Sequence, residues 1–207
     1  MNRFIGRCVM VFLLSLFSAT NAHSDDQIHA ILSDTPLDRS FHDMYNLDFP
    51  AALKEAAAYQ TQNPENPMGA IAEAAALLFS EFDRLHVLQS EFFSTDEGFA
   101  ARNKLTADPK VKARFEAALT LAEQKAQFNL EKERNQSDSL FALALMNGLR
   151  ADYASLIEKR DLAAFSYTKT ASAYADKLLA IAPDYYDGYM AAGIGKYIVG
   201  LKPAPVR

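Results

Sequence analysis

Cysteine, tryptophan and strand-forming patterns are what this 207-residue chain has least of. Tryptophan is absent, and Cys8 is the only cysteine. Val, Ile and Thr form no sustained alternating run, and no Asn-Gly hairpin turn occurs, so a β-rich fold is excluded. Half of the residues are hydrophobic, which is enough for a core built from helices.

The first 22 residues have the three parts of a secretory signal. Arg3 and Arg7 precede an apolar run, CVMVFLLSLF, and small residues follow up to Ala22. The run is too short to span a bilayer comfortably. We therefore expect residues 1–22 to be a signal peptide cut after Ala22, and residues 23–207 to be exported, with a periplasmic location in a bacterium and membrane contact only during export. An uncleaved anchor is the alternative.

Removal of residues 1–22 changes the cysteine content and the net charge of the mature chain, and both changes exclude classes of function. Cys8 leaves with it, so the mature chain has no disulfide, no thiolate nucleophile and no cysteine-ligated metal. The basic residues fall from 21 to 19 against 26 acidic ones, a formal net charge of −7. No basic stripe remains to neutralise phosphates, and this disfavours nucleic-acid partners.

Motifs that carry chemistry are also missing. There is no G-x-S-x-G elbow, and G-x-G occurs once, inside a predicted helix and without the rest of a phosphate-binding fingerprint. Asp83 and His86 could face one ion, but no third ligand is recognisable. The pair Asp184 and Asp187 stands at a helix start, where capping explains it. We expect no catalytic residue, metal or cofactor, and predict that the protein is not an enzyme.

Helical periodicity runs through the mature chain. It is clearest in residues 68–93, where apolar residues recur every three or four positions: Ile71, Ala75, Leu78, Phe82, Leu85, Leu88 and Phe92. This stripe predicts one helix of about seven turns. Cap and proline signals predict further helix starts at Thr35-Pro36, Asp48, Ser94, Asp108-Pro109, Ser137 or Asp138, Asp161, and Asp184 or Asp187.

Two stretches share a spacing around proline. The first contains Ala52, Pro64, Gly69 and Ala74; the second contains Ala171, Pro183, Gly188 and Gly193. A third stretch, with Ala126, Asp138 and Gly148, fits in part. Small residues beside a helix-breaking proline let consecutive helices approach closely, as in a stacked helical hairpin. The spacing predicts that Gly193 faces the preceding helix, whereas Gly195 has no counterpart.

This pattern resembles tetratricopeptide repeats over residues 36–75 and 138–200. The chain is also similar to uncharacterised exported bacterial proteins of that type in two blocks, Gly148–Ala154 and Tyr197–Arg207. The resemblance implies an all-α, right-handed stack of helical hairpins, here with long central helices, over residues 23–207. Such chains continue with more helices, so it also implies either a last helix without its partner or a sequence that is a C-terminally incomplete fragment.

Candidate contact residues follow from the resemblance and from tyrosine usage. In tetratricopeptide arrays the first helix of each hairpin lines a concave groove, which implies that Asn147 and Arg150 contact a peptide there; Arg150 could equally pair with a nearby carboxylate. Seven of nine tyrosines lie between 153 and 197. Most are expected to fill helix junctions, but Tyr185 and Tyr186 lie in a turn and are candidates for partner contact.

We expect a non-catalytic interaction module that holds a partner protein or peptide in such a groove. The alternative is a small-molecule or lipid binder whose ligand lies between the long central helices, against the apolar stripe from Ile71 to Phe92.

Overall fold

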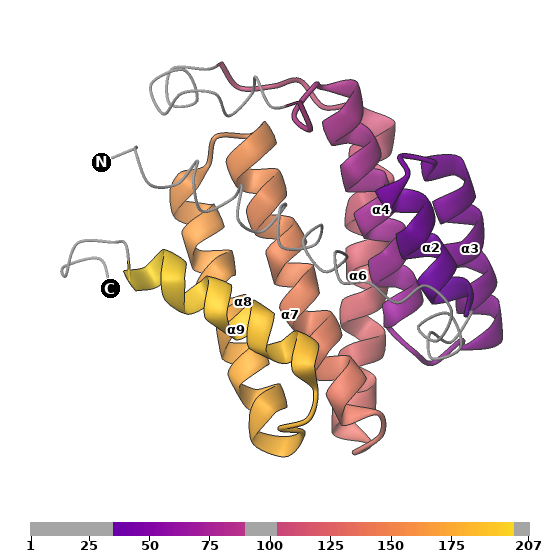
Figure 1. Cartoon of the computed structure of the whole chain (residues 1–207), viewed down its shortest axis with the longest axis vertical. Helices are drawn as coiled ribbons and strands as arrows, with labels where there is room; N and C mark the ends of the chain where they lie inside the picture. Colours follow the sequence, from indigo (N-terminus) through magenta and orange to yellow (C-terminus); the bar gives the residue numbers. More distant parts are fainter. Residues whose placement is uncertain (1–34, 90–102, 201–207) are drawn as a thin grey trace, which may run out of the picture.

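The computed structural model describes residues 35–89 and 103–200, which are helical with short turns and contain no strand. Figure 1 shows the helices, and consecutive ones run in opposite directions. They are α2 (Pro36–Tyr45), α3 (Phe49–Gln62), α4 (Met68–Arg84), α6 (Pro109–Glu131), α7 (Gln136–Asp152), the π-helical turn η2 (Tyr153–Ile157), α8 (Asp161–Ile181) and α9 (Tyr186–Gly200). The all-α prediction is confirmed. Residues 1–22 and Ser94 lie outside the described residues.

Helix starts follow the cap signals of the sequence. The Thr35 side chain accepts a hydrogen bond from Asp38 N, and the Asp38 carboxylate accepts one from Thr35 N in return, which is a complete capping box. Asp48 caps α3 by accepting from Ala51 N. Asp108 caps α6 by accepting from Lys110 N and Val111 N, with proline as the first helical residue.

Three helices end in left-handed residues that are not glycine. Leu47, His86 and Glu133 have φ values of 60°, 59° and 53°. After α4, His86 N donates to Asp83 O and Val87 N donates to Phe82 O, the two bonds of a Schellman motif. The predicted helix over 68–93 is therefore wrong in length, because α4 stops at Arg84. His86 lies beyond the helix, so the predicted three-residue helical spacing from Asp83 does not exist.

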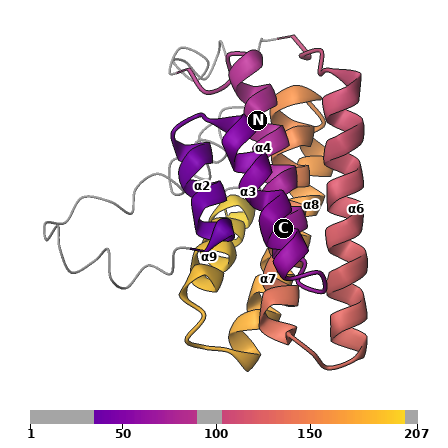
Figure 2. The same ribbon diagram turned by 90° about the vertical axis from the view of Figure 1, so that its right-hand side faces the viewer.

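The helices form two layers. Besides its neighbours in the chain, α4 packs against α2 and α7, and α7 also contacts α9. Alternate helices α2, α4, α7 and α9 thus share one layer, backed by α3, α6 and α8. Figure 2 shows α2 and α9 on the side of the molecule opposite α6.

The core lies where α4 is covered on both faces. Ile71, Leu78 and Phe82 of α4 are almost completely buried against Phe115 and Leu119 of α6. The apolar stripe of this region, as far as it is described, is therefore core. Farther along the chain α7, α8 and α9 meet through alanines, at Ala144, Ala175 and Ala192. Small residues there let the helix backbones approach closely.

The two proline turns have the same geometry, 119 residues apart. Asn63 and Ala182 precede the prolines, which push them out of the helical region to φ/ψ of −129°/65° and −139°/76°. A turn bond follows in each, from Asn66 N to Asn63 O (3.0 Å) and from Tyr185 N to Ala182 O (3.1 Å).

The glycine five residues after each proline is tightly packed against the preceding helix. A Cβ on Gly69 would lie 2.6 Å from Gln60 Cγ, and one on Gly188 would lie 3.0 Å from Leu179 Cδ2. Together with the shared turn bonds, this confirms the predicted five-residue spacing as a packing feature.

The prediction for Gly193 is wrong. Gly193 is exposed, and a Cβ there would meet no atom within 4 Å. Gly195 is the buried glycine, and a Cβ on it would overlap Ser172 of α8. The residues of α9 that face α8 are Gly188, Ala192 and Gly195, which recur at intervals of four and three. Gly193 lies roughly 200° around the helix from Gly195.

Candidate ligand-binding groove

A cavity of about 490 Å³ opens in the layer of alternate helices. One wall is α2 and the other is α9, with residues of α3, α4 and α7 between them. The pocket therefore depends on helices that are distant in sequence and that the tertiary fold brings together.

The walls of this groove are largely apolar. Leu37 and Phe41 line it from α2, Met190 and Ile194 from α9, and Phe141 from α7. Phe41 and Met190 remain 37% and 38% exposed, although each belongs to a cavity wall. Large apolar side chains left partly exposed in a concave site are what a ligand would cover.

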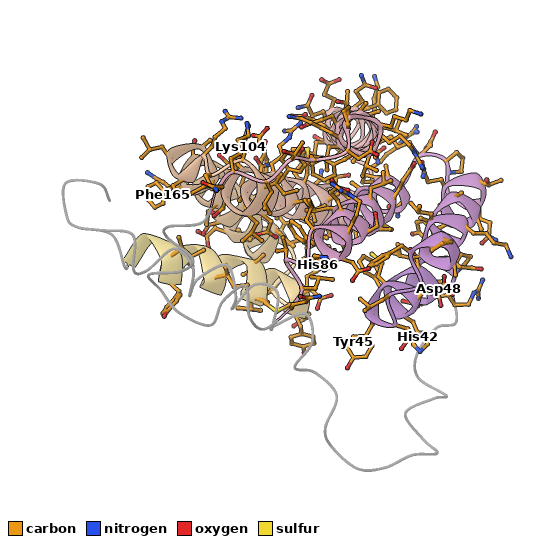
Figure 3. All side chains as sticks on the ribbon, turned by 90° about the horizontal axis from the view of Figure 1, so that it is seen from above. His42, Tyr45, Asp48, His86, Lys104 and Phe165 are labelled. Carbon is orange, nitrogen blue, oxygen red and sulfur yellow. The ribbon has the colours of Figure 1, made fainter. Side chains whose placement is uncertain are left out.

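Exposed tyrosines extend both walls beyond the cavity. Tyr45 lies four residues after Phe41 on α2 and is 53% exposed. Tyr186 and Tyr197 flank Met190 by four and seven residues on α9 and are 78% and 50% exposed. Residues at these intervals share a helix face. Figure 3 shows Tyr45 projecting from α2 on the same side of the molecule as α9.

The charged residues of the groove are all acidic. Asp38, Asp138 and Asp187 line it, and no Lys, Arg or His does so among the residues that the structure describes. Within residues 35–89 and 103–200, no ion pair joins Asp138 or Asp187 to a basic side chain, whereas ion pairs do join α2 to α3, α4 to α6, α6 to α7 and α8 to α9. The groove therefore combines aromatic walls with the carboxylates of Asp138 and Asp187, which no basic side chain among the described residues pairs with.

Asp138 also connects the two proline turns. Its Oδ2 accepts from Asn66 Nδ2 at 2.9 Å, and its Oδ1 accepts from the Tyr185 hydroxyl at 3.4 Å. Asn66 and Tyr185 are equivalent positions of the repeat, 119 residues apart. One carboxylate in the first turn of α7 thus holds both turns beside the groove, and it keeps lone pairs for a further donor.

Two tyrosine hydroxyls in the groove stay protonated. Burial raises the pKa of Tyr185, and the negative charges of Asp138 and Asp187 add to the effect. Burial also raises the pKa of Tyr59, with Asp138 and Asp38 contributing in the same direction. Both phenols therefore remain neutral hydrogen-bonding groups at physiological pH.

The structure places the two predicted helix contacts away from this groove. Asn147 is 5% exposed, and its Nδ2 donates to Leu143 O one turn earlier in α7. Arg150 pairs with Glu123 of α6 at 3.2 Å, and not with Asp152, Glu158 or Asp161. In this structure neither side chain lines the cavity.

The two predicted turn tyrosines lie at the groove. Tyr185 lines it, and its ring lies 5.1 Å from the Phe141 ring, centroid to centroid. Tyr186 is 78% exposed at the start of the α9 wall.

Several groove residues were not among the predicted contacts. Phe41, Phe141 and Met190 carried no sequence signal apart from helical spacing, and Asp187 was attributed to capping. The intervals between Asp187, Met190, Ile194 and Tyr197 would have indicated a common face of the last helix, but not what that face meets.

Other polar clusters are less suited to binding. A second cavity of about 430 Å³ contains Lys112, Tyr153 and Glu158, but Lys112 and Glu158 already pair at 2.8 Å. Asp152 is 4% exposed outside both cavities, and its Oδ2 has no hydrogen-bond partner among the described residues. Within those same residues no group of three His, Cys, Asp or Glu could hold a metal ion, and no helix is long and apolar enough to cross a membrane.

Comparison with known proteins found no matching family model, no matching curated protein and no matching solved structure. The function is therefore argued from the geometry of the groove.

Proposed function

We propose that this chain is an exported, non-catalytic interaction module that holds an extended segment of a partner protein or peptide in the groove between α2 and α9. The carrying observation is the cavity with half-exposed Phe41 and Met190 on facing walls. The exposed tyrosines beyond it favour a ligand longer than the cavity, because each presents ring surface and a polar tip to a partner.

The hairpin stack proposed for the fold is a right-handed, tetratricopeptide-like one. The repeated turn geometry and the alternation of helices between two layers support it. In such a stack a concave surface formed by alternate helices is suited to lie along an extended chain.

Site-specific photo-crosslinking in the envelope fraction tests the proposal. Met190, inside the groove, is replaced by p-benzoylphenylalanine; the control carries the same residue in place of Tyr189, its exposed neighbour on another face of α9. We expect a cross-linked partner from position 190 and little from position 189. Equal yields, or none from position 190 in a folded protein, would contradict the proposal.

A small molecule in the same cavity is the second candidate function. The volume of about 490 Å³ lies within the usual range of ligand pockets, about 300–1,000 Å³. The space between the central helices α4 and α6 is filled by core side chains, so the groove is the better place for such a ligand. Native mass spectrometry of protein purified from its host would show the bound mass, and a protein that never carries one argues against this function.

A further inference from the structure

We infer that the groove selects a cationic side chain, a lysine or arginine flanked by apolar residues in an extended peptide segment. This inference rests on the proposed function and adds the chemistry of the partner. It follows from the charge of the groove lining, the placement of its aromatic rings and the length of its walls.

Charge complementarity comes first. Asp38, Asp138 and Asp187 approach one cavity from three different helices, and none of the described residues that line it is basic. Each has a local reason to stand in the first turn of its helix, since carboxylates are favoured there. Their convergence on one space is a property of the tertiary fold. An anionic ligand would meet the like charges of Asp138 and Asp187, whereas an ammonium or guanidinium group would neutralise them.

The rings add a second attraction for a cation. Phe141 and Tyr185 contact each other at the cavity, with ring planes inclined by 50°. A cation within about 6 Å of such a ring face is attracted by its quadrupole, most strongly where water is displaced. Asp187 is exposed and has no partner within residues 35–89 and 103–200, so its carboxylate is open to a ligand donor. Asp138 is committed in part to Asn66 and Tyr185.

The length of the walls favours a peptide over a free amine. From Tyr186 to Tyr197 the α9 wall rises about 16 Å, which matches about five residues of extended chain. A small amine would fill the cavity and leave Tyr186 and Tyr197 uncovered. Apolar residues on either side of the cationic one would cover them.

Affinity selection from synthetic pentapeptide pools tests the inference. The central residue is Lys, Arg, norleucine or Glu, and the flanking positions are mixtures of Ala, Leu, Phe and Ser. We expect the full chain to retain the Lys and Arg pools about tenfold more than the norleucine pool at low salt, and the Glu pool least. The preference should shrink about threefold or more at high salt, because partly exposed charges are screened.

Matched variants assign the effect to the groove. Asp187→Asn removes one lining charge, and we expect it to lower the preference for Lys over norleucine about threefold or more. Asp184→Asn removes the same charge from an exposed turn position outside the cavity lining, and it should leave the preference unchanged. Both variants should keep the helical circular dichroism of the parent chain.

The outcomes separate this inference from the proposed function. Equal retention of the Lys and norleucine pools, or a preference that Asp187→Asn does not change, overturns cation selection and leaves peptide binding standing. If butylammonium chloride displaces the retained peptides at the same concentration as a free Lys pentapeptide does, the groove recognises an amine alone. That result would overturn the inference that its ligand is a peptide. Retention of no pool overturns the inference, and the proposed function falls with it only if position 190 also gives no cross-link.

Discussion

At the scale of single residues, Gly193 and Gly195 of α9 have opposite surroundings. In Gly195→Ala the new methyl would overlap Ser172 of α8, with Oγ at 2.7 Å. We expect the free energy of unfolding to fall by about 1–3 kcal/mol through overpacking. In Gly193→Ala the methyl meets nothing within 4 Å. The better helix propensity of alanine should raise the free energy of unfolding by up to about 1 kcal/mol. Urea denaturation of both variants measures the difference.

A double variant identifies the contact. Adding Ser172→Gly to Gly195→Ala removes the overlapped side chain and should restore part of the lost stability, with a coupling energy above about 0.5 kcal/mol. Additive losses would show that the two helices do not meet at this pair.

Sequence spacing could place a glycine at this crossing but not choose which one. The comparison with Ala74 selected Gly193, yet α4 is buried around nearly its whole circumference, so burial of Ala74 carries no information about helix rotation. On α9, which is covered by α8 on one side, the rotation of the helix about its own axis decides which glycine faces α8. Rotation is set by tertiary packing rather than by distance from the proline.

Asp152 gives a pH-dependent stability. Burial raises the pKa of its carboxyl well above the ordinary 3.8, so the folded chain holds a proton that the unfolded chain releases. The stabilisation is complete below the unfolded pKa and is lost as pH rises through the folded pKa. Within that window the free energy of unfolding should fall by about 1.4 kcal/mol per pH unit from this group.

Asp152→Asn keeps the shape of the neutral acid and removes its titration. Urea midpoints measured from acid to neutral pH should decline less steeply for this variant than for the parent chain. Asp184→Asn, which removes an exposed carboxylate, is the control for net charge. Parallel curves for Asp152→Asn and the parent would contradict the prediction.

At the scale of helices, the starts signalled by Thr35, Asp48 and Asp108 were predicted correctly, whereas α7 begins at Gln136 after Asn135 and not at the predicted Ser137 or Asp138. The end of α4 was also predicted wrongly. Thr35, Asp48 and Asp108 announce helix starts because a cap is a local hydrogen bond made by a short polar side chain. Among the described residues no glycine takes the left-handed position, and Leu47 and His86 take it after α2 and α4. Nothing in those side chains distinguishes them from helical residues, and the predicted helix over 68–93 was too long for this reason.

The left-handed end of α6 can be improved by glycine. Glu133 has φ of 53°, a conformation that costs a residue with a Cβ roughly 1–2 kcal/mol. After the entropy cost of glycine in the unfolded chain, Glu133→Gly should raise the free energy of unfolding by about 0.5–1 kcal/mol. Glu131→Gly, in the last turn of α6, should lower it by a similar amount. Thermal denaturation compares them, and a loss in both would mean that Glu133 is not strained.

At the scale of the whole molecule, stability should fall from the centre of the stack to its described ends. The α4 helix has neighbours on both sides, whereas α2 and α9 each border one side of the groove. We expect amide hydrogens of α4 and α7 to exchange most slowly and those of α2 and α9 fastest, because terminal hairpins open without unfolding the rest. Hydrogen exchange with mass spectrometry measures this order, and uniform protection would contradict it.

The groove could not have been predicted from the sequence because it forms only when helices that are distant along the chain pack together. Phe41, Phe141 and Met190 come from three helices more than 40 residues apart along the chain. Turn tyrosines were recognised because their position in a turn is local. Asn147 and Arg150 were carried over from the resemblance, and the rotation of α7 points them to α7 itself and to α6.

The alternation of helices between two layers has a consequence for how this molecule can change over generations. Side chains that line the groove lie mainly on α2, α7 and α9, while α3 packs behind α2, α6 and α8 behind α7, and α8 behind α9. Variation at the ligand-facing positions can therefore proceed while the supporting helices keep their composition. Descendants of one ancestral stack would then be expected to diverge in the partners they capture sooner than in the shape that captures them.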